Sequence, residues 1–142
     1  MRLQSAIFVL EDTLPRRADA GKVLSILKME GVWMYAVTDL PRAEAEDTLR
    51  ALGLFDYFRG ILTAGEALCP ASDARMYEKA MRRLRSTPRD TVVFVGRLDA
   101  LRSAKAAGLR TAAVFGAADD AEWDAMRAEA EEVVESFSDF LA

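Results

Sequence analysis

Two patterns of apolar and polar positions alternate along this chain. Short apolar runs without internal alternation are typical of strands buried on both faces. Longer segments in which apolar residues recur every three or four positions are typical of helices with one buried stripe. The predicted strands are residues 5–10, 32–37, 60–64, 91–95 and 110–115. The predicted helices are residues 18–30, 42–52, 73–85, 98–107 and 118–131.

Strands that alternate with helices of this length predict an α/β fold: a doubly wound parallel sheet covered by helices on both faces, in three layers. We expect the 142 residues to form a single domain, residues 1–142. Residues 133–134 are a candidate for a last short strand, and residues 136–141 for a terminal helical turn. Residues 65–72 are expected to form a loop.

The first strand ends in a polar turn within residues 9–13, Val-Leu-Glu-Asp-Thr. The second strand likewise runs into Thr38 and Asp39. In an open parallel sheet, ligands bind beyond the carboxyl ends of the strands. We therefore expect the functional residues to lie close to residues 9–13.

Composition excludes several classes of function. The formal charge of −4 gives no electrostatic reason to expect nucleic acid or an anionic membrane as a partner. The chain has no histidine, the commonest general base and metal ligand, and Cys69 is alone, so neither a disulfide within the chain nor a zinc cluster is expected. The N-terminal apolar run is too short for a signal peptide, and no run approaches a membrane span, so we predict a cytoplasmic protein.

The segment Val9-Leu10-Glu11-Asp12-Thr13-Leu14 resembles the first motif of the haloacid dehalogenase-like (HAD) superfamily, a hydrophobic strand followed by Asp-x-Asp-Gly-Thr-Leu. Thr38 stands where the second family motif has Thr or Ser at a strand end. Later segments are similar to the family in order and spacing. They are residues 55–62, 70–77, 92–96 and 104–108.

This resemblance implies a HAD-like Rossmannoid sheet ordered 5-4-1-2-3, with the first strand central. Family members often insert a cap domain after the first motif or after the third strand. Here about one helix fills each of these spaces, so we expect no cap domain and a cleft open to solvent. An open cleft excludes water poorly and supports phosphoryl chemistry on small metabolites less well.

The catalytic positions that the resemblance implies carry other residues here. The family nucleophile, an aspartate that forms an aspartyl-phosphate, is Val9. The aspartate that acts as general acid and base is Glu11, which keeps the functional group on a longer side chain. The lysine of the third motif is Cys69, and the acidic residues of the fourth motif are Arg97 and Leu101. The resemblance therefore implies a domain whose catalytic positions are vestigial.

A magnesium cofactor is not expected, and we assign no metal ligand. Mg²⁺ requires hard oxygen ligands, which the nucleophile and fourth-motif positions no longer supply, and a cation at Arg97 disfavours a metal nearby. Four carboxylates could bind a divalent ion in a rearranged way, but we favour their interpretation as turn and cap residues. They are Glu11, Asp12, Asp39 and Asp99.

Arg97 has two interpretations. With Thr38 and the backbone N–H groups after Val9, it could form a site for a phosphate or another small anion. The favoured alternative is that Arg97 forms ion pairs with nearby carboxylates and fills the space that a metal takes in the family. The candidate carboxylates are Glu11, Asp12 and Asp99.

Other residues have structural interpretations. Cys69 is expected to be a structural or loop thiol, since no histidine can activate it. Trp33, Met34 and Tyr35 are expected in the core of the second strand, or at an interface if the sheet edge lies there.

We therefore predict a catalytically inactive HAD-like domain, a pseudoenzyme with a binding or interaction role, either as a homodimer or with a protein partner. One alternative is a phosphatase or hydrolase with a non-standard site that uses Glu11 or Asp12. Another is a protein that binds phosphate or a phosphorylated ligand through Thr38 and Arg97. Fold alone does not decide among these functions.

Overall fold

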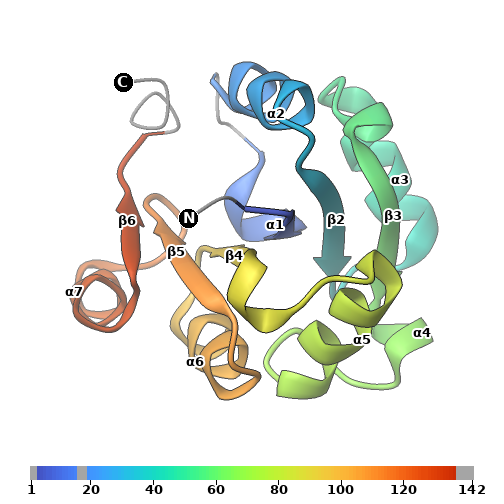
Figure 1. Cartoon of the computed structure of the whole chain (residues 1–142). Helices are drawn as coiled ribbons and strands as arrows, with labels where there is room; N and C mark the ends of the chain where they lie inside the picture. Colours follow the sequence, from blue (N-terminus) through green and yellow to red (C-terminus); the bar gives the residue numbers. More distant parts are fainter. Residues whose placement is uncertain (1–2, 16–18, 137–142) are drawn as a thin grey trace.

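The computed structural model of the chain describes residues 3–15 and 19–136. Its centre is a six-stranded parallel sheet in the order β3-β2-β1-β4-β5-β6 (Figure 1). The strands are β1 (Ser5–Val9), β2 (Trp33–Thr38), β3 (Phe58–Thr63), β4 (Thr91–Val95), β5 (Arg110–Val114) and β6 (Glu132–Val134). The helices are α1 (Leu10–Thr13), α2 (Ala20–Met29), α3 (Arg42–Ala51), α4 (Ala64–Ala67), α5 (Ala74–Leu84), α6 (Leu98–Ala106) and α7 (Asp120–Glu129), with short 3₁₀ turns η1 (Phe55–Tyr57) and η2 (Pro88–Asp90).

The predicted strand order 5-4-1-2-3 is confirmed, with β1 between β2 and β4. The candidate last strand is also confirmed: residues 133–134 belong to β6, which extends the sheet beyond β5. The N–H of Phe115 donates to the carbonyl of Val134 at 2.9 Å and holds the end of β6 to the sheet.

Side chains of β1 alternate between two hydrophobic clusters, one on each face of the sheet. Ile7 and Val9 belong to the cluster that α5, α6 and α7 cover. Ala6 and Phe8 belong to the opposite cluster, which α2 and α3 cover (Figure 1). Phe8 stacks on Phe94 of β4 with 4.5 Å between ring centroids and 5° between the ring planes. All five residues of β1 are buried, as a strand covered on both faces requires.

Two short helices stand where a turn and a loop are predicted. Instead of a polar turn, residues 10–13 form α1, in which the Thr13 hydroxyl donates to the carbonyl of Val9 at 2.7 Å. The predicted loop at residues 65–72 begins inside α4, whose first turn is closed by a capping box between Thr63 and Glu66.

Trp33 is not in the core: 46% of its surface is exposed, while Met34 and Tyr35 are buried as predicted. The pairing of β2 with β3 begins only at Met34, opposite Phe58, so Trp33 lies before the strand is covered on this side. The predicted terminal turn at residues 136–141 falls almost entirely outside the described residues.

The spaces after α1 and after β3 hold no inserted cap domain in the part of the chain that the structure describes. A cap would cover the carboxyl ends of the strands. Among the same residues, no helix is long and apolar enough to cross a membrane.

Candidate functional site

The candidate site lies at the carboxyl ends of the three central strands. The strand registers place Val9 of β1 opposite Val37 of β2, and Phe8 opposite Phe94 of β4. The segments that follow these strands therefore leave the sheet at one edge, as expected for a doubly wound fold. They carry the predicted residues Glu11, Asp12, Thr38, Asp39 and Arg97.

Val9 ends β1 with an apolar side chain that is fully buried. It packs in the cluster under α5 and α6, together with Val37 and Val95 from the ends of the neighbouring strands. The position that the family resemblance assigns to a nucleophile thus contributes to the hydrophobic core and carries no side-chain oxygen.

Glu11 is held by hydrogen bonds to both of its carboxylate oxygens. Oε1 accepts from the Thr38 hydroxyl at 2.8 Å, and Oε2 accepts from the Asp39 N–H at 2.9 Å. The Thr38 oxygen in turn accepts from the N–H of Leu40 at 3.0 Å. Glu11 therefore joins α1 to the end of β2, and the Thr38 hydroxyl proton is already donated.

Arg97, between β4 and α6, forms ion pairs with three carboxylates. Its Nε lies 2.7 Å from Asp99 Oδ1, and its Nη2 lies 2.8 Å from Asp39 Oδ2. Its Nη1 lies 3.3 Å from Asp12 Oδ2. The ion pairs predicted with Asp12 and Asp99 are present, Glu11 instead bonds Thr38, and Asp39 is a partner that the sequence interpretation did not include.

Asp39 also forms a hydrogen bond to a second segment of the chain. Its Oδ1 accepts from the N–H of Ala71 at 2.9 Å, next to the third-motif position. Asp39 thus connects Arg97 to the chain that leads into α5. In the sequence, only the place of Asp39 after a strand end indicated a functional residue, because its neighbours in space depend on the tertiary fold.

Burial and charge act in opposite directions at this cluster. Burial raises the pKa of Asp12 above its ordinary value, and the Arg97 cation only partly offsets this. Burial alone would lower the pKa of Arg97, but its hydrogen bond to Asp39 and the charges of Asp12 and Asp99 outweigh it and raise the pKa. Arg97 therefore stays protonated and provides a permanent positive charge.

Gly96 lets α1 approach the end of β4. A Cβ atom at this position would lie 2.4 Å from the backbone oxygen of Asp12, far inside van der Waals contact. Glycine is therefore required sterically, because any side chain would push α1 away from the turn that carries Arg97.

The remaining predicted positions are buried and apolar in character. Cys69 lies in the same hydrophobic cluster as Val9, and Leu101 packs there from α6. The ammonium of Lys79 donates to the carbonyl of Ala67, so this nearby lysine caps the end of α4.

The carboxylates at the strand ends are engaged by groups of the chain itself. The carboxylates of Asp12, Asp39 and Asp99 surround a guanidinium, which takes the central place that a divalent ion would need. Glu11 is bonded separately to Thr38. Across residues 3–15 and 19–136, no group of three or more His, Cys, Asp or Glu side chains is arranged to hold a metal ion.

Solved structures share this architecture. The isolated core domain of a Streptococcus pneumoniae TIGR4 protein, provisionally assigned as a phosphoglycolate phosphatase, aligns with a TM-score of 0.75 at 17% identity, over 99% of this chain and 94% of that one. A Thermotoga maritima protein provisionally assigned as a beta-phosphoglucomutase aligns with a TM-score of 0.76 at 24% identity, over 86% of this chain and 56% of that one.

A third similar structure is CbbY from Rhodobacter sphaeroides, in complex with xylulose-1,5-bisphosphate. It has a TM-score of 0.76 and 25% identity, over 86% of this chain and 54% of that one. The chain thus spans little more than half the length of the Thermotoga and Rhodobacter proteins. The sequence profile of the haloacid dehalogenase-like hydrolases matches residues 3–108, which include β1, β2, β4 and all of the residues around Arg97. The chain belongs to the haloacid dehalogenase-like hydrolase family.

Proposed function

We propose that this HAD-like domain does not transfer phosphoryl groups through an aspartyl enzyme and acts as a binding or interaction module. The observation that carries this proposal is Val9, a fully buried apolar side chain at the end of β1. An aspartyl-phosphate intermediate needs a carboxylate oxygen at the reacting centre, and a valine offers none.

The arrangement of Glu11 and Arg97 supports the same proposal. Both oxygens of Glu11 are engaged by Thr38 and Asp39, so its carboxylate acts as a structural link. Arg97 directs Nε, Nη1 and Nη2 at carboxylates, so a phosphate that approached the guanidinium would meet three negative charges around it. This like-charge repulsion disfavours the phosphate-binding alternative.

One observation favours hydrolysis as a second candidate function. Burial raises the pKa of Asp12, and a carboxyl group with a raised pKa is suited to proton transfer. In this alternative, Asp12 or Glu11 would activate a water molecule directly, without a covalent intermediate. The family's hydrolase activity makes hydrolysis the main alternative to the proposed binding role.

A cytoplasmic location stays a prediction.

The test is hydrolysis of an aryl phosphate by the pure protein, with and without Mg²⁺. Glu11→Ala and Asp12→Asn are compared with Glu44→Ala, an exposed control on α3. We expect that the parent protein shows no turnover beyond that of Glu11→Ala or Asp12→Asn. Turnover that is lost in Glu11→Ala or Asp12→Asn, but kept in Glu44→Ala, would contradict the proposal and establish the hydrolase.

Phosphate binding is tested in parallel by thermal unfolding. A ligand that binds only the folded state raises the melting temperature. We expect inorganic phosphate to leave the melting temperature unchanged. An increase that disappears in Arg97→Ala would instead support the anion-binding alternative.

A further inference from the structure

A second surface of interest lies at the amino ends of β2 and β3, opposite the site described above. Trp33 opens β2 with 46% of its surface exposed, and Met29 at the end of α2 is 87% exposed. Large apolar side chains grouped with aromatic residues at a protein surface are characteristic of interaction sites. β3 is an edge strand of the described sheet, so nothing in the sheet covers this side.

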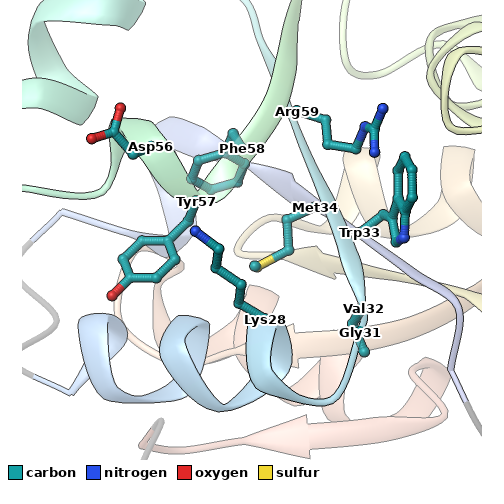
Figure 2. Close-up of a pocket in the computed structure, with 9 residues that line it drawn as sticks. All are labelled: Lys28, Gly31, Val32, Trp33, Met34, Asp56, Tyr57, Phe58 and Arg59. Atoms are coloured by element: carbon teal, nitrogen blue, oxygen red, sulfur yellow. The ribbon is translucent and has the colours of Figure 1, made fainter.

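Two cations of this surface lie on aromatic rings. The guanidinium carbon of Arg59 is 3.2 Å from the ring centroid of Trp33, and the ammonium of Lys28 is 5.7 Å from that of Tyr57. Figure 2 shows Arg59 beside Trp33 and Lys28 beside Tyr57, on either side of Phe58 and Met34. Tryptophan, tyrosine and arginine are the residues that most often dominate binding energy at interfaces.

These side chains line a shallow, open hollow of about 250 Å³ between α2 and the starts of β2 and β3. A second hollow of about 540 Å³, lined by Leu84 and Arg85 of the α5 end, shares Trp33 and Gly31 with it. Trp33 therefore separates two concave areas, a shape into which side chains of a partner can insert.

The charges of this surface are of both signs and form no ion pair within residues 3–15 and 19–136. Lys28, Asp56 and Arg59 are exposed, and none of them forms an ion pair with another described residue. In Figure 2 the carboxylate of Asp56 points away from Arg59 and lies on the other side of the Phe58 ring. The positive and negative groups therefore belong to one surface but do not pair with each other.

We propose that the surface formed by Lys28, Trp33, Asp56, Tyr57 and Arg59 binds the same surface of a second copy of this chain. In an interface with twofold symmetry, residue i contacts j and residue j contacts i. A surface that carries separate charges of both signs is complementary to itself in this arrangement: Asp56 of each copy neutralises Arg59 or Lys28 of the other. The exposed Trp33 supplies apolar contact area.

Charge also argues against other occupants. An anionic partner would place a like charge opposite Asp56. A cationic partner would place like charges opposite Lys28 and Arg59. A partner with charges of both signs can satisfy all three side chains, and a second copy carries both signs on this surface. The inference does not depend on whether the strand-end site is catalytic, because the two lie at opposite ends of the sheet.

The test measures mass in solution by sedimentation velocity, from micromolar to submillimolar concentration. We expect a dimer for the parent chain. Trp33→Ala, Arg59→Asp and Asp56→Arg each should weaken dimerisation by about 10- to 100-fold. The charge-exchanged double variant Asp56→Arg/Arg59→Asp should recover most of the loss, since it restores opposite charges across the twofold axis.

Arg82→Asp is the matched control, because Arg82 is an exposed cation on α5 outside this surface. It should leave the dimer intact, and circular dichroism should show that every variant is folded. A parent chain that has the mass of one copy at all concentrations overturns the proposal. A dimer that survives both Trp33→Ala and Arg59→Asp also overturns it, and a double variant that recovers nothing overturns the charge pairing.

Discussion

Among single residues, Arg97 forms ion pairs with three carboxylates at the strand ends. Its side chain is 24% exposed, and that of its partner Asp12 is 18% exposed. Removing one member of a largely buried ion pair leaves the other charge without compensation, which costs more than the pair itself contributes. The three carboxylates around Arg97 would then repel one another.

We predict that Arg97→Ala lowers the free energy of unfolding by about 2–4 kcal/mol at neutral pH. The matched control is Arg102→Ala, which breaks an ion pair with Glu129 whose arginine side chain is 60% exposed. This control should cost much less, because solvent screens an exposed ion pair. Urea unfolding of the three proteins measures both values, and equal losses would contradict the role of Arg97.

Arg97→Ala should also create a dependence on divalent ions. Without the guanidinium, the carboxylates of Asp12, Asp39 and Asp99 repel one another, and a divalent ion that draws their oxygens together would relieve this repulsion. Millimolar Mg²⁺ or Ca²⁺ should then raise the melting temperature of the variant and leave that of the parent unchanged. An equal response of both proteins would show that Arg97 does not take the place of an ion.

The resemblance to the family assigned motif positions to Val9, Glu11, Cys69 and Arg97 from the sequence, because the order and spacing of the motifs fix where these positions fall along the chain. The contact between Arg97 and Asp39 could not be predicted in the same way. It depends on the distance between two loops from different strands, and a long arginine side chain can reach several carboxylates. The sequence narrowed the choice of partners but did not identify this one.

Within the elements, the contact between α1 and the end of β4 depends on Gly96. We predict that Gly96→Ala destabilises the protein by about 1–3 kcal/mol, since overpacking forces the backbone to move. The obstacle is the backbone oxygen of Asp12, 2.4 Å from the added Cβ atom, and backbone cannot rotate away as a side chain can.

Gly65→Ala is the control for this prediction. Gly65 lies in α4, and its nearest neighbour to an added Cβ atom is the Thr63 hydroxyl oxygen at 4.0 Å, an ordinary contact. Alanine there should be neutral or stabilise by up to about 1 kcal/mol. Thermal unfolding distinguishes the two, and a Gly96→Ala protein as stable as the parent would refute the steric argument.

The capping box of α4 has a charge-dependent part. The hydrogen bond from Arg42 lowers the pKa of Glu66 to about 2, against burial, which raises it. Because the folded-state pKa is depressed, this stabilisation is complete above the unfolded value near 4.5 and is lost as pH falls toward 2. The pair is largely exposed, so solvent screening keeps its contribution small.

We predict that Glu66→Gln costs about 0.5–1 kcal/mol at pH 7 and progressively less as pH falls from about 4.5 to about 2. Glutamine keeps an oxygen that can accept from the Thr63 N–H, so the substitution removes the charge and preserves the cap. Urea unfolding at a series of pH values measures the difference from the parent. A difference independent of pH would assign it to packing.

Elements of four residues were the ones that periodicity missed. α1 and α4 are too short to show a helical repeat, and their geometry comes from Thr13 and from the Thr63–Glu66 capping box. The longer helices have several turns, so their apolar stripes identified them. Trp33 was assigned to the core because the residues that follow it in the sequence are apolar. The pairing of β2 with β3 begins one residue later, at Met34.

For the molecule as a whole, the sheet is expected to differ in stability from its centre to its edges. β1 is paired on both sides and buried throughout, whereas β6 has three residues, of which only Val134 is buried. Segments with few buried contacts open locally with low free energy, while core strands open only on global unfolding.

We predict that the amides of β1 and β4 exchange with solvent only through global unfolding, and that those of β6 exchange by local opening. Native-state hydrogen exchange in low denaturant separates these two regimes. β1 and β4 should respond to denaturant with the slope of global unfolding, and β6 should respond weakly. A β6 with the same protection and slope as β1 would refute this.

At this scale the sequence was most informative. Alternating strand and helix patterns predicted a parallel sheet with two helical layers, and the family resemblance supplied the order of five strands. An interface at Trp33 was only an alternative in the sequence interpretation, and the charged residues around it were not predicted, because Lys28, Asp56 and Arg59 lie far apart along the chain. Each is an ordinary charged residue in the sequence, and only the fold places them around one exposed tryptophan.

At the strand ends, the positive charge among the carboxylates belongs to a side chain and not to a bound ion. A bound ion exchanges with solution, so a site that uses one is divided between loaded and empty molecules by a dissociation constant. Arg97 is covalently attached, and its raised pKa keeps it protonated. Every copy of the chain therefore carries this charge from the moment it folds. Chelators cannot remove it, and the supply of metal in the surroundings does not set its occupancy.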